Sequence, residues 1–115
     1  MSPLHKDMVW LDGTPKTPPV PSEIRIEAGI RFRLVQAGVQ LGMPHSCPMP
    51  CIGKNCHELR ITGIDGIWRF FYFIDSDAIV NLRIICKKTQ KTPQREIELC
   101  KSRLKGYLKA KGGSK

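Results

Sequence analysis

Arginine and lysine side chains are the groups in this sequence best suited to chemistry, and phosphate is the group they would bind. Arg60, Arg69 and Arg83 each lie in a segment where apolar and polar residues alternate, as in a β-strand. The segment KKTQKTPQR, residues 87–95, follows the last of these strands and carries four positive charges. A guanidinium group offers a planar fork of N–H donors that matches a phosphate, so these residues predict an anion-binding site.

The turns between the strand-like segments decide which of these side chains meet. Asp65-Gly66 is a strong signal for a two-residue hairpin turn. A three-residue turn at residues 75–77 then places Arg83 directly opposite Arg69, with Arg60 as their diagonal neighbour. Like charges opposed across two strands repel each other, so we expect this arrangement to serve an anion rather than the stability of the sheet.

Side chains alternate between the two faces of a strand, and burial therefore selects the register. In the expected register one face is apolar and forms the core, with Leu59, Ile61, Trp68, Phe70, Tyr72, Ile74, Ala78, Val80, Leu82, Ile84 and Cys86. We expect the other face to be open, concave and basic, with Glu58, Arg60, Thr62, Arg69, Asn81, Arg83 and Lys87.

Residues 23–42 fit two kinds of element. Their alternation suits a strand, but about 18 unbroken residues is long for a strand, and a helical spacing is also present. Pro21-Ser22 provides an N-cap, so we predict a helix. The helical spacing is that of Ile26, Ile30, Leu34, Ala37 and Leu41.

The other elements follow from shorter signals. Residues 8–11 are a candidate first strand, the proline-rich segment 14–22 is a connector, and residues 42–56 are expected to form a loop. Thr92-Pro93 predicts the start of a C-terminal helix. The apolar stripe of that helix would contain Ile97, Cys100, Leu104 and Leu108.

The length and charge of the chain limit its class. We expect 115 residues to form one domain, with residues 1–7 and 110–115 flexible. The 19 Lys and Arg residues exceed the 10 Asp and Glu residues and give a net charge of +9, which favours nucleic acid or an acidic protein as a partner. The chain has neither a long apolar run nor the pattern of a secretory signal, so we expect a cytoplasmic protein outside the membrane.

The five cysteines allow one alternative chemistry. Zinc could be bound by the cluster of His45, Cys47, Cys51, Cys56 and His57. Structural zinc sites favour two cysteines separated by two residues, and the gaps here are longer and flanked by prolines. We therefore predict no metal and no cofactor, and interpret the cluster as a proline-stiffened loop. Cys86 and Cys100 lie in apolar patterns and are expected to be buried.

Three segments of the chain resemble a known family. CHELRI (56–61), WRFFYFID (68–75) and CKKTQKTPQREIELCKSRLKGY (86–107) are similar to the RelE/ParE superfamily of toxins, and most similar to its HigB-like branch, which includes phage-derived members. The resemblance covers roughly residues 8–109, and its most specific part is the Lys-Lys-Thr-x-Lys-Thr-Pro segment at 87–93.

The resemblance implies a fold and a function. The fold would be an α+β microdomain with a curved antiparallel sheet, an N-terminal helix on one face and a C-terminal helix. Many members cut mRNA in the ribosomal A site, and each is neutralised by an antitoxin, often one with a helix-turn-helix domain, in a hetero-oligomer. Two alternatives stay open, namely inhibition of DNA gyrase, as by ParE-like members, and a catalytically inactive RNA-binding homologue.

For a nuclease of this kind the attacking group is the 2′-hydroxyl of the RNA itself. Arg60, Arg69 and Arg83 would stabilise the charge that develops on the phosphate. Glu58 would either take the proton of the 2′-hydroxyl or pair with Arg60 or Arg69, and His57 is a reserve on the opposite face. The RNA backbone would be held by Lys87, Lys88, Lys91 and Arg95. Relatives often carry a histidine or an aromatic residue in place of Arg83. Several also carry a tyrosine near the C-terminus, inside the groove, and the only tyrosine late in this sequence is Tyr107, in the last helix.

Overall fold

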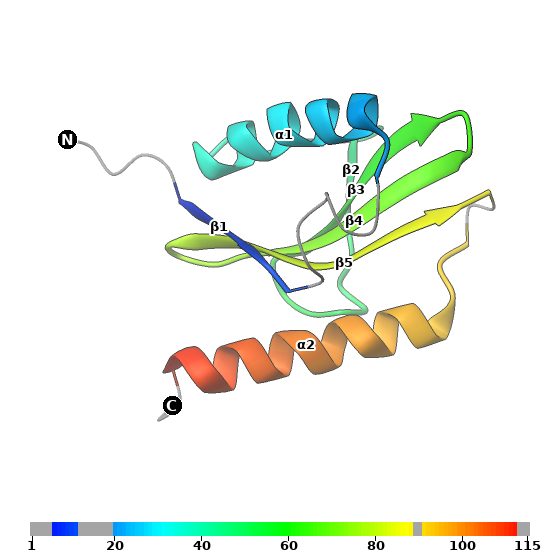
Figure 1. The fold of residues 1–115 in the computed structure, drawn as a ribbon. Coiled ribbons are helices and arrows are strands. Elements are labelled where there is room, and N and C mark those ends of the chain that lie inside the picture. The colour runs from blue at the N-terminus through cyan, green and yellow to red at the C-terminus, as the bar shows by residue number, and fades with distance from the viewer. Residues whose placement is uncertain (1–5, 12–19, 89–90, 113–115) are drawn as a thin grey trace.

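The computed structural model describes residues 6–11, 20–88 and 91–112, which form one sheet between two helices. The elements in chain order are β1 (Asp7–Trp10), α1 (Ser22–Gln36), β2 (Ser46–Pro48), β3 (Cys56–Gly63), β4 (Gly66–Ile74), β5 (Ala78–Lys87) and α2 (Gln94–Gly112). The helices α1 and α2 lie on opposite sides of the sheet (Figure 1). The α+β class is confirmed. Neither helix in the described residues is long and apolar enough to cross a membrane.

The five strands are arranged in the order β1-β5-β4-β3-β2. The three strands expected from the alternating segments are confirmed as β3, β4 and β5, and they pair antiparallel. The candidate first strand is confirmed as β1, which pairs parallel with β5 and makes the sheet mixed. The expectation that residues 42–56 form only a loop is wrong, because β2 lies within them and pairs with residues 57–59 of β3.

The hairpin between β3 and β4 turns one residue earlier than expected. Gly63 pairs with Gly66, so the turn is formed by Ile64 and Asp65. Gly66 has a φ of 138°, and a Cβ at this position would lie 2.9 Å from the carbonyl oxygen of Lys87, so the position requires glycine. The register differs from the expected one by two residues, and every side chain therefore keeps its predicted face.

A β-bulge makes the expected register between β4 and β5 wrong. Tyr72 pairs with Asn81 and Phe71 pairs with Arg83, which leaves Leu82 as the additional residue. A bulge of this kind shifts the alternation of side chains along the strand. Arg83 is therefore opposite Phe71 rather than Arg69.

The bulge also corrects the expected composition of the two faces. Ala78, Val80 and Leu82 pack on the α2 side of the sheet, whereas Ile79 and Ile84 pack on the α1 side. The prediction that Asn81 lies on an open face is wrong too, since its side chain is fully buried. The physical reason is that α2 covers much of the second face, so β5 must bury apolar side chains on both of its faces.

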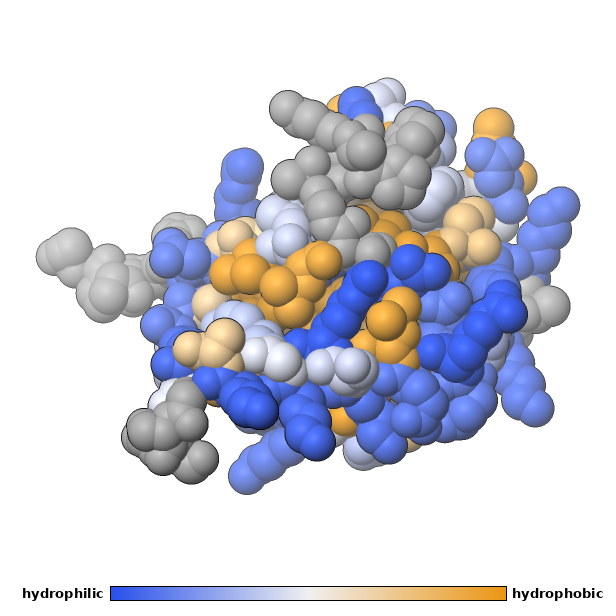
Figure 2. Space-filling view, turned by 60° about the horizontal axis from the view of Figure 1, so that its bottom comes forward, coloured by the Kyte–Doolittle hydropathy of each residue, from blue (hydrophilic) through white to orange (hydrophobic). Residues whose placement is uncertain are grey.

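The cluster beneath α2 joins the helix to the sheet and to the loop after β2. It contains Ile52, Cys56, Phe71, Phe73, Ala78, Val80, Leu82, Ile85, Cys100 and Leu104. The expected stripe of α2 is confirmed at Cys100 and Leu104, but Leu108 is 44% exposed. On the side of the molecule that carries α2, hydrophilic residues cover most of the visible surface around a central band of apolar residues (Figure 2).

The C-terminal end of α2 is fastened to the turn between β4 and β5. The Asp75 carboxylate accepts hydrogen bonds from Tyr107 Oη and Lys111 Nζ, each at 2.8 Å, and Lys111 also pairs with Asp77. Asp7 and residues 110–112, which belong to the termini expected to be flexible, lie in β1 and α2. Residues 1–5 and 113–115 lie outside the described residues.

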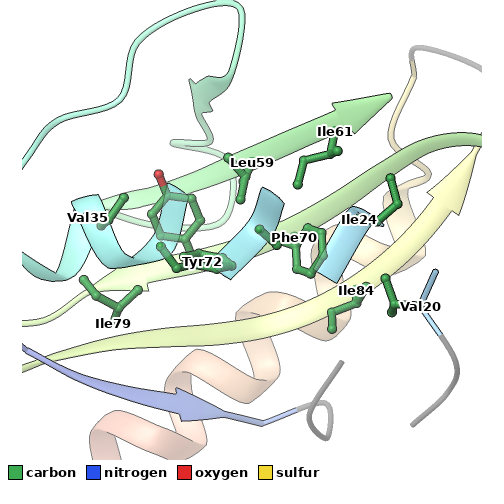
Figure 3. Close-up of a cluster of buried hydrophobic side chains, with 11 residues drawn as sticks. Val20, Ile24, Val35, Leu59, Ile61, Phe70, Tyr72, Ile79 and Ile84 are labelled. Atoms are coloured by element: carbon green, nitrogen blue, oxygen red, sulfur yellow. The ribbon is translucent and has the colours of Figure 1, made fainter. Parts of the chain in front are cut away.

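The second cluster lies between α1 and the sheet, and Figure 3 shows its side chains pointing toward one another. Phe32 of α1 meets the rings of Phe70 and Tyr72 edge-on, with centroids 5.8 and 5.3 Å apart. The helix is confirmed, but its N-cap is Pro21, no side-chain cap bond is formed there among the described residues, and Ser22 is already helical. The buried residues of α1 are Ile24, Ala28, Phe32 and Val35.

Candidate functional site

The candidate site begins with one carboxylate on β3 that holds two of the predicted arginines. Glu58 Oε1 accepts a hydrogen bond from Arg60 Nε at 2.7 Å, and Glu58 Oε2 accepts one from Arg69 NH1 at 3.0 Å. Thr92 Oγ1, just before α2, lies 3.5 Å from the same Oε2. Of the two roles expected for Glu58, pairing with the arginines is the one observed.

Burial separates the two arginines. The side chains of Glu58 and Arg69 are both 0% exposed, whereas that of Arg60 is 28% exposed. The expectation that Arg69 faces solvent is therefore wrong, because α2 and the residues before it cover this part of the sheet. Arg69 pairs directly with Arg60 across the two strands, and the carboxylate between them offsets the repulsion that two opposed arginines would otherwise cause.

A second carboxylate holds the third arginine. Glu96, in the first turn of α2, accepts a hydrogen bond from Arg83 Nε at 2.7 Å, and Arg95 Nε lies 4.0 Å from its other oxygen. The Glu96 side chain is 8% exposed, that of Arg83 is 30% exposed and that of Arg95 is 81% exposed. This ion pair joins β5 to the start of α2, and Arg103 NH1 adds a bond of 2.7 Å to the carbonyl oxygen of Leu82.

The two carboxylates do not neutralise the cluster. Four arginines pair with two glutamates, which leaves a surplus of two positive charges. The arginines are Arg60, Arg69, Arg83 and Arg95, and the glutamates are Glu58 and Glu96. We call these residues with Thr92 the arginine cluster. Its partly exposed guanidinium groups are held in place by the carboxylates, and fixed cations of this kind stabilise an anion without having to reorganise around it.

The predicted lysines lie at the rim of the arginine cluster. Lys87 is the last residue of β5 and is partly exposed, and Lys88 and Lys91 are exposed on either side of residues 89–90, which lie outside the described residues. Lys91 and Thr92 line a hollow in the surface together with Pro93 and Gln94. The rim therefore adds exposed positive charge beside Thr92, the residue that reaches Glu58.

His57 lies on the opposite side of the sheet, as predicted. Its ring stacks on Tyr72 at 5.4 Å, and the Tyr72 hydroxyl lies 2.8 Å from Ser46 Oγ. These side chains line a largely apolar pocket of about 240 Å³ at the end of α1. Burial lowers the pKa of His57 below its ordinary value, so the ring is neutral at pH 7. The pocket is separate from the arginine cluster.

The cysteines are thiols without disulfides in the described residues. Burial, with the nearby Cys51, raises the pKa of Cys56 to about 11, and burial with the neighbouring Glu96 raises that of Cys100 to about 12. Cys56 and Cys100 are thus poor nucleophiles at neutral pH. Among the described residues, no three His, Cys, Asp or Glu side chains form a group that could hold a metal ion.

Two parts of the arginine cluster were not found from the sequence. Glu96 follows the predicted helix start by three residues, where a glutamate is a common partner of the helix N-terminus. Only the packing of α2 on β5 shows that it binds Arg83 instead. Thr92 was expected as a helix cap, and its hydroxyl is instead directed at Glu58.

Comparison with known families places most of the chain in one family. The model of the family described as "Phage derived protein Gp49-like (DUF891)" matches residues 18–105, which include α1, the whole of β2 to β5 and the arginine cluster. This family belongs to the RelE/ParE toxin superfamily, on its HigB-like side. A search of the curated proteins finds no match to the chain.

Proposed function

The chain belongs to the Gp49-like family of phage-derived proteins, and on that premise we propose that it is the toxin of a type II toxin–antitoxin pair. We further propose that it cuts mRNA on the ribosome. Membership in this family suggests a toxin. The observation that supports RNA cleavage is the arginine cluster, in which Glu58 and Glu96 hold partly exposed guanidinium groups beside a rim of lysines.

The proposed reaction is an attack within the RNA. The 2′-oxygen forms a bond to the adjacent phosphorus while the bond from phosphorus to the 5′-oxygen breaks, which yields a 2′,3′-cyclic phosphate and a 5′-hydroxyl. The 2′-hydroxyl loses a proton, and the leaving 5′-oxygen gains one. Negative charge grows on the non-bridging oxygens, and the partly exposed guanidinium groups of Arg60 and Arg83 would meet it.

Glu58 and Arg69 act through Arg60 in this proposal. Both are 0% exposed, so neither can reach a phosphate that stays outside the protein. Because the two oxygens of Glu58 already accept bonds from arginines, we propose that Glu58 positions Arg60 and leaves the proton transfers to groups of the ribosome.

Lys87, Lys88, Lys91 and Arg95 would hold the RNA backbone. Contacts of this kind release counterions, so affinity should fall steeply with salt. Removing one of these lysines should lower the slope of log K against log salt by about 1. The same positive surface suits an antitoxin with acidic segments, which would neutralise the toxin by covering it.

Primer extension on an mRNA translated in a purified system tests the proposal. We expect discrete cuts that require ribosomes and that disappear with Arg60→Ala. Lys109→Ala is the matched control, because Lys109 is an exposed cation about 20 Å along α2 from Arg95 and should leave the cuts unchanged.

Three results would contradict the proposal. Absence of cuts with intact translation refutes cleavage, and loss of DNA supercoiling in a separate assay with gyrase would identify gyrase as the target. Binding to RNA or ribosomes without cuts would identify an inactive RNA-binding homologue. Cuts that persist with Arg60→Ala would show that the arginine cluster is not the site.

A further inference from the structure

The outer side of α1 carries an apolar stripe in addition to its buried side. Ile26, Ile30 and Leu34 are 65%, 56% and 39% exposed. They are four residues apart and therefore lie in one line along the helix. α1 forms an outer layer of the molecule, with the sheet on its inner side only (Figure 1). The three residues belong to the helical spacing found in the sequence. A helix that covers a single core needs only one apolar side, so it does not require this second stripe.

The stripe continues beyond the end of the helix. Gly38, with a φ of 95°, donates to Val35 O at 2.9 Å, and Val39 donates to Leu34 O at 3.0 Å. These two bonds define a Schellman motif, which brings the residue after the glycine against the helix residue five positions before it, here Val39 and Leu34. Val39 is 45% exposed, and beyond it Met43 is 65% exposed at the edge of the pocket beside His57.

The charges beside the stripe fit a second copy of the same chain. Glu27 and Arg31 lie along one flank, three residues before Ile30 and Leu34, and line an open hollow with Ile26 and Ile30. They form a weak ion pair of 3.4 Å within the helix. In an antiparallel pair of helices related by a two-fold axis, like flanks face each other. Glu27 of one copy then lies opposite Arg31 of the other, and this happens twice.

We infer that the apolar stripe of α1 is a self-association surface, on which two copies pack with their α1 helices antiparallel. The two-fold axis passes near Ile30, and Ile26 of each copy meets Leu34 of the other. This inference is independent of the proposed function, because the stripe of α1 contributes no residue to the arginine cluster.

The net charge of +9 does not oppose this packing strongly. Each copy directs Arg69, Arg83 and Arg95 away from the interface, to the side of the sheet that carries α2, whereas Arg60 lines a pocket with Glu27. The sheet and the layer formed by α1 are each about 10 Å thick, so the arginines beneath α2 in the two copies lie farther apart than the screening length of about 8 Å at physiological salt. A partner helix with a strong negative charge would gain little from this flank of the stripe, where Glu23 and Glu27 outnumber Arg31.

Sedimentation velocity over a concentration series tests the inference. We expect the wild-type protein to shift from monomer to dimer at concentrations below about 1 mM, the range in which weak specific association is visible. Ile30→Glu should weaken association by about 100-fold or more, because the axis places the two new carboxylates against each other. Ile64→Glu is the matched control, since Ile64 is 94% exposed at the β3–β4 turn, and it should leave the dimer unchanged.

A charge exchange makes the test specific for the antiparallel arrangement. Glu27→Arg alone and Arg31→Glu alone should each weaken association, and the double variant should restore it. Circular dichroism of every variant checks that the monomers remain folded. A wild-type protein that stays monomeric throughout would overturn the inference and leave the stripe to another protein. A dimer that survives Ile30→Glu, or a double exchange that fails to restore the dimer, would overturn it too.

Discussion

Arg69→Met removes one partner of a buried carboxylate and should destabilise the protein strongly. Among the described residues, Glu58 would then keep one charged partner, Arg60, which is 28% exposed, and the Thr92 hydroxyl lies 3.5 Å away. Breaking a buried ion pair on one side typically costs about 3–5 kcal/mol. Because Arg60 remains, we expect a loss of about 3 kcal/mol, the lower end of that range and a large part of the stability of a small domain.

The double variant Glu58→Met/Arg69→Met separates charge from packing. It leaves no buried charge without a partner, and Arg60 can turn toward solvent. We therefore expect the double variant to be more stable than Arg69→Met alone by at least about 1 kcal/mol. Urea unfolding at pH 7 measures both free energies of unfolding.

Lys101→Met is the control for this series. Lys101 belongs to an exposed ion pair with Glu98 at 3.8 Å and should change the stability by less than about 1 kcal/mol. The reasoning is refuted if Arg69→Met costs no more than the control, or if the double variant is no more stable than Arg69→Met alone.

Three further predictions concern other parts of the fold. Burial alone would raise the pKa of Asp75, but hydrogen bonds from the lysine and tyrosine of α2 and from a backbone N–H lower it. This carboxylate therefore stabilises the protein fully above about pH 4 and less as the pH falls further. Asp75→Asn should flatten the dependence of the melting temperature on pH between about pH 5 and 2, and an unchanged slope would contradict the contact. Iodoacetamide at pH 8, followed by mass spectrometry, should modify the exposed Cys51 first and Cys100 only after unfolding, since burial raises the pKa of Cys100 to about 12; early modification of Cys100 would show that α2 opens readily. Gly66→Ala should lower the stability by about 1–3 kcal/mol, because Gly66 has a positive φ. Gly106→Ala should raise the stability by about 0.5–1 kcal/mol in thermal unfolding, because Gly106 is helical and an added Cβ would meet no atom within 4 Å. Equal effects of the two substitutions would refute the argument that the turn requires glycine at position 66.

The sequence was sufficient for the elements with a clear period. The alternation in β3 predicted its faces, and an error of one residue in the turn, which shifts the register by two residues, did not move any side chain to the other face. The arginines at 60, 69 and 83 were expected together and do lie on one side of the sheet. These successes rest on the period of two residues in a strand, which is visible without knowing what covers it.

The bulge at Leu82 could not be predicted in the same way. β5 is apolar at nearly every position, so its pattern fits several registers equally well. The expectation of an open basic face assumed that α2 does not cover the side of the sheet that carries the arginines. The sequence of α2 does not show which face of the sheet the helix covers. Once α2 covers that face, Arg69 must be buried and needs the charge of Glu58, and Arg83 needs that of Glu96.

The rate of cleavage of mRNA on programmed ribosomes, measured with excess protein in a single turnover, tests the central claim most directly. Removing one preorganised donor from a developing oxyanion typically slows a reaction by about 100-fold to 1,000-fold. We predict a loss of that order for Arg60→Ala, an unchanged rate for Lys109→Ala, and a 2′,3′-cyclic phosphate on the upstream fragment. A rate for Arg60→Ala within a few-fold of the wild type would contradict the claim that the arginine cluster cleaves RNA.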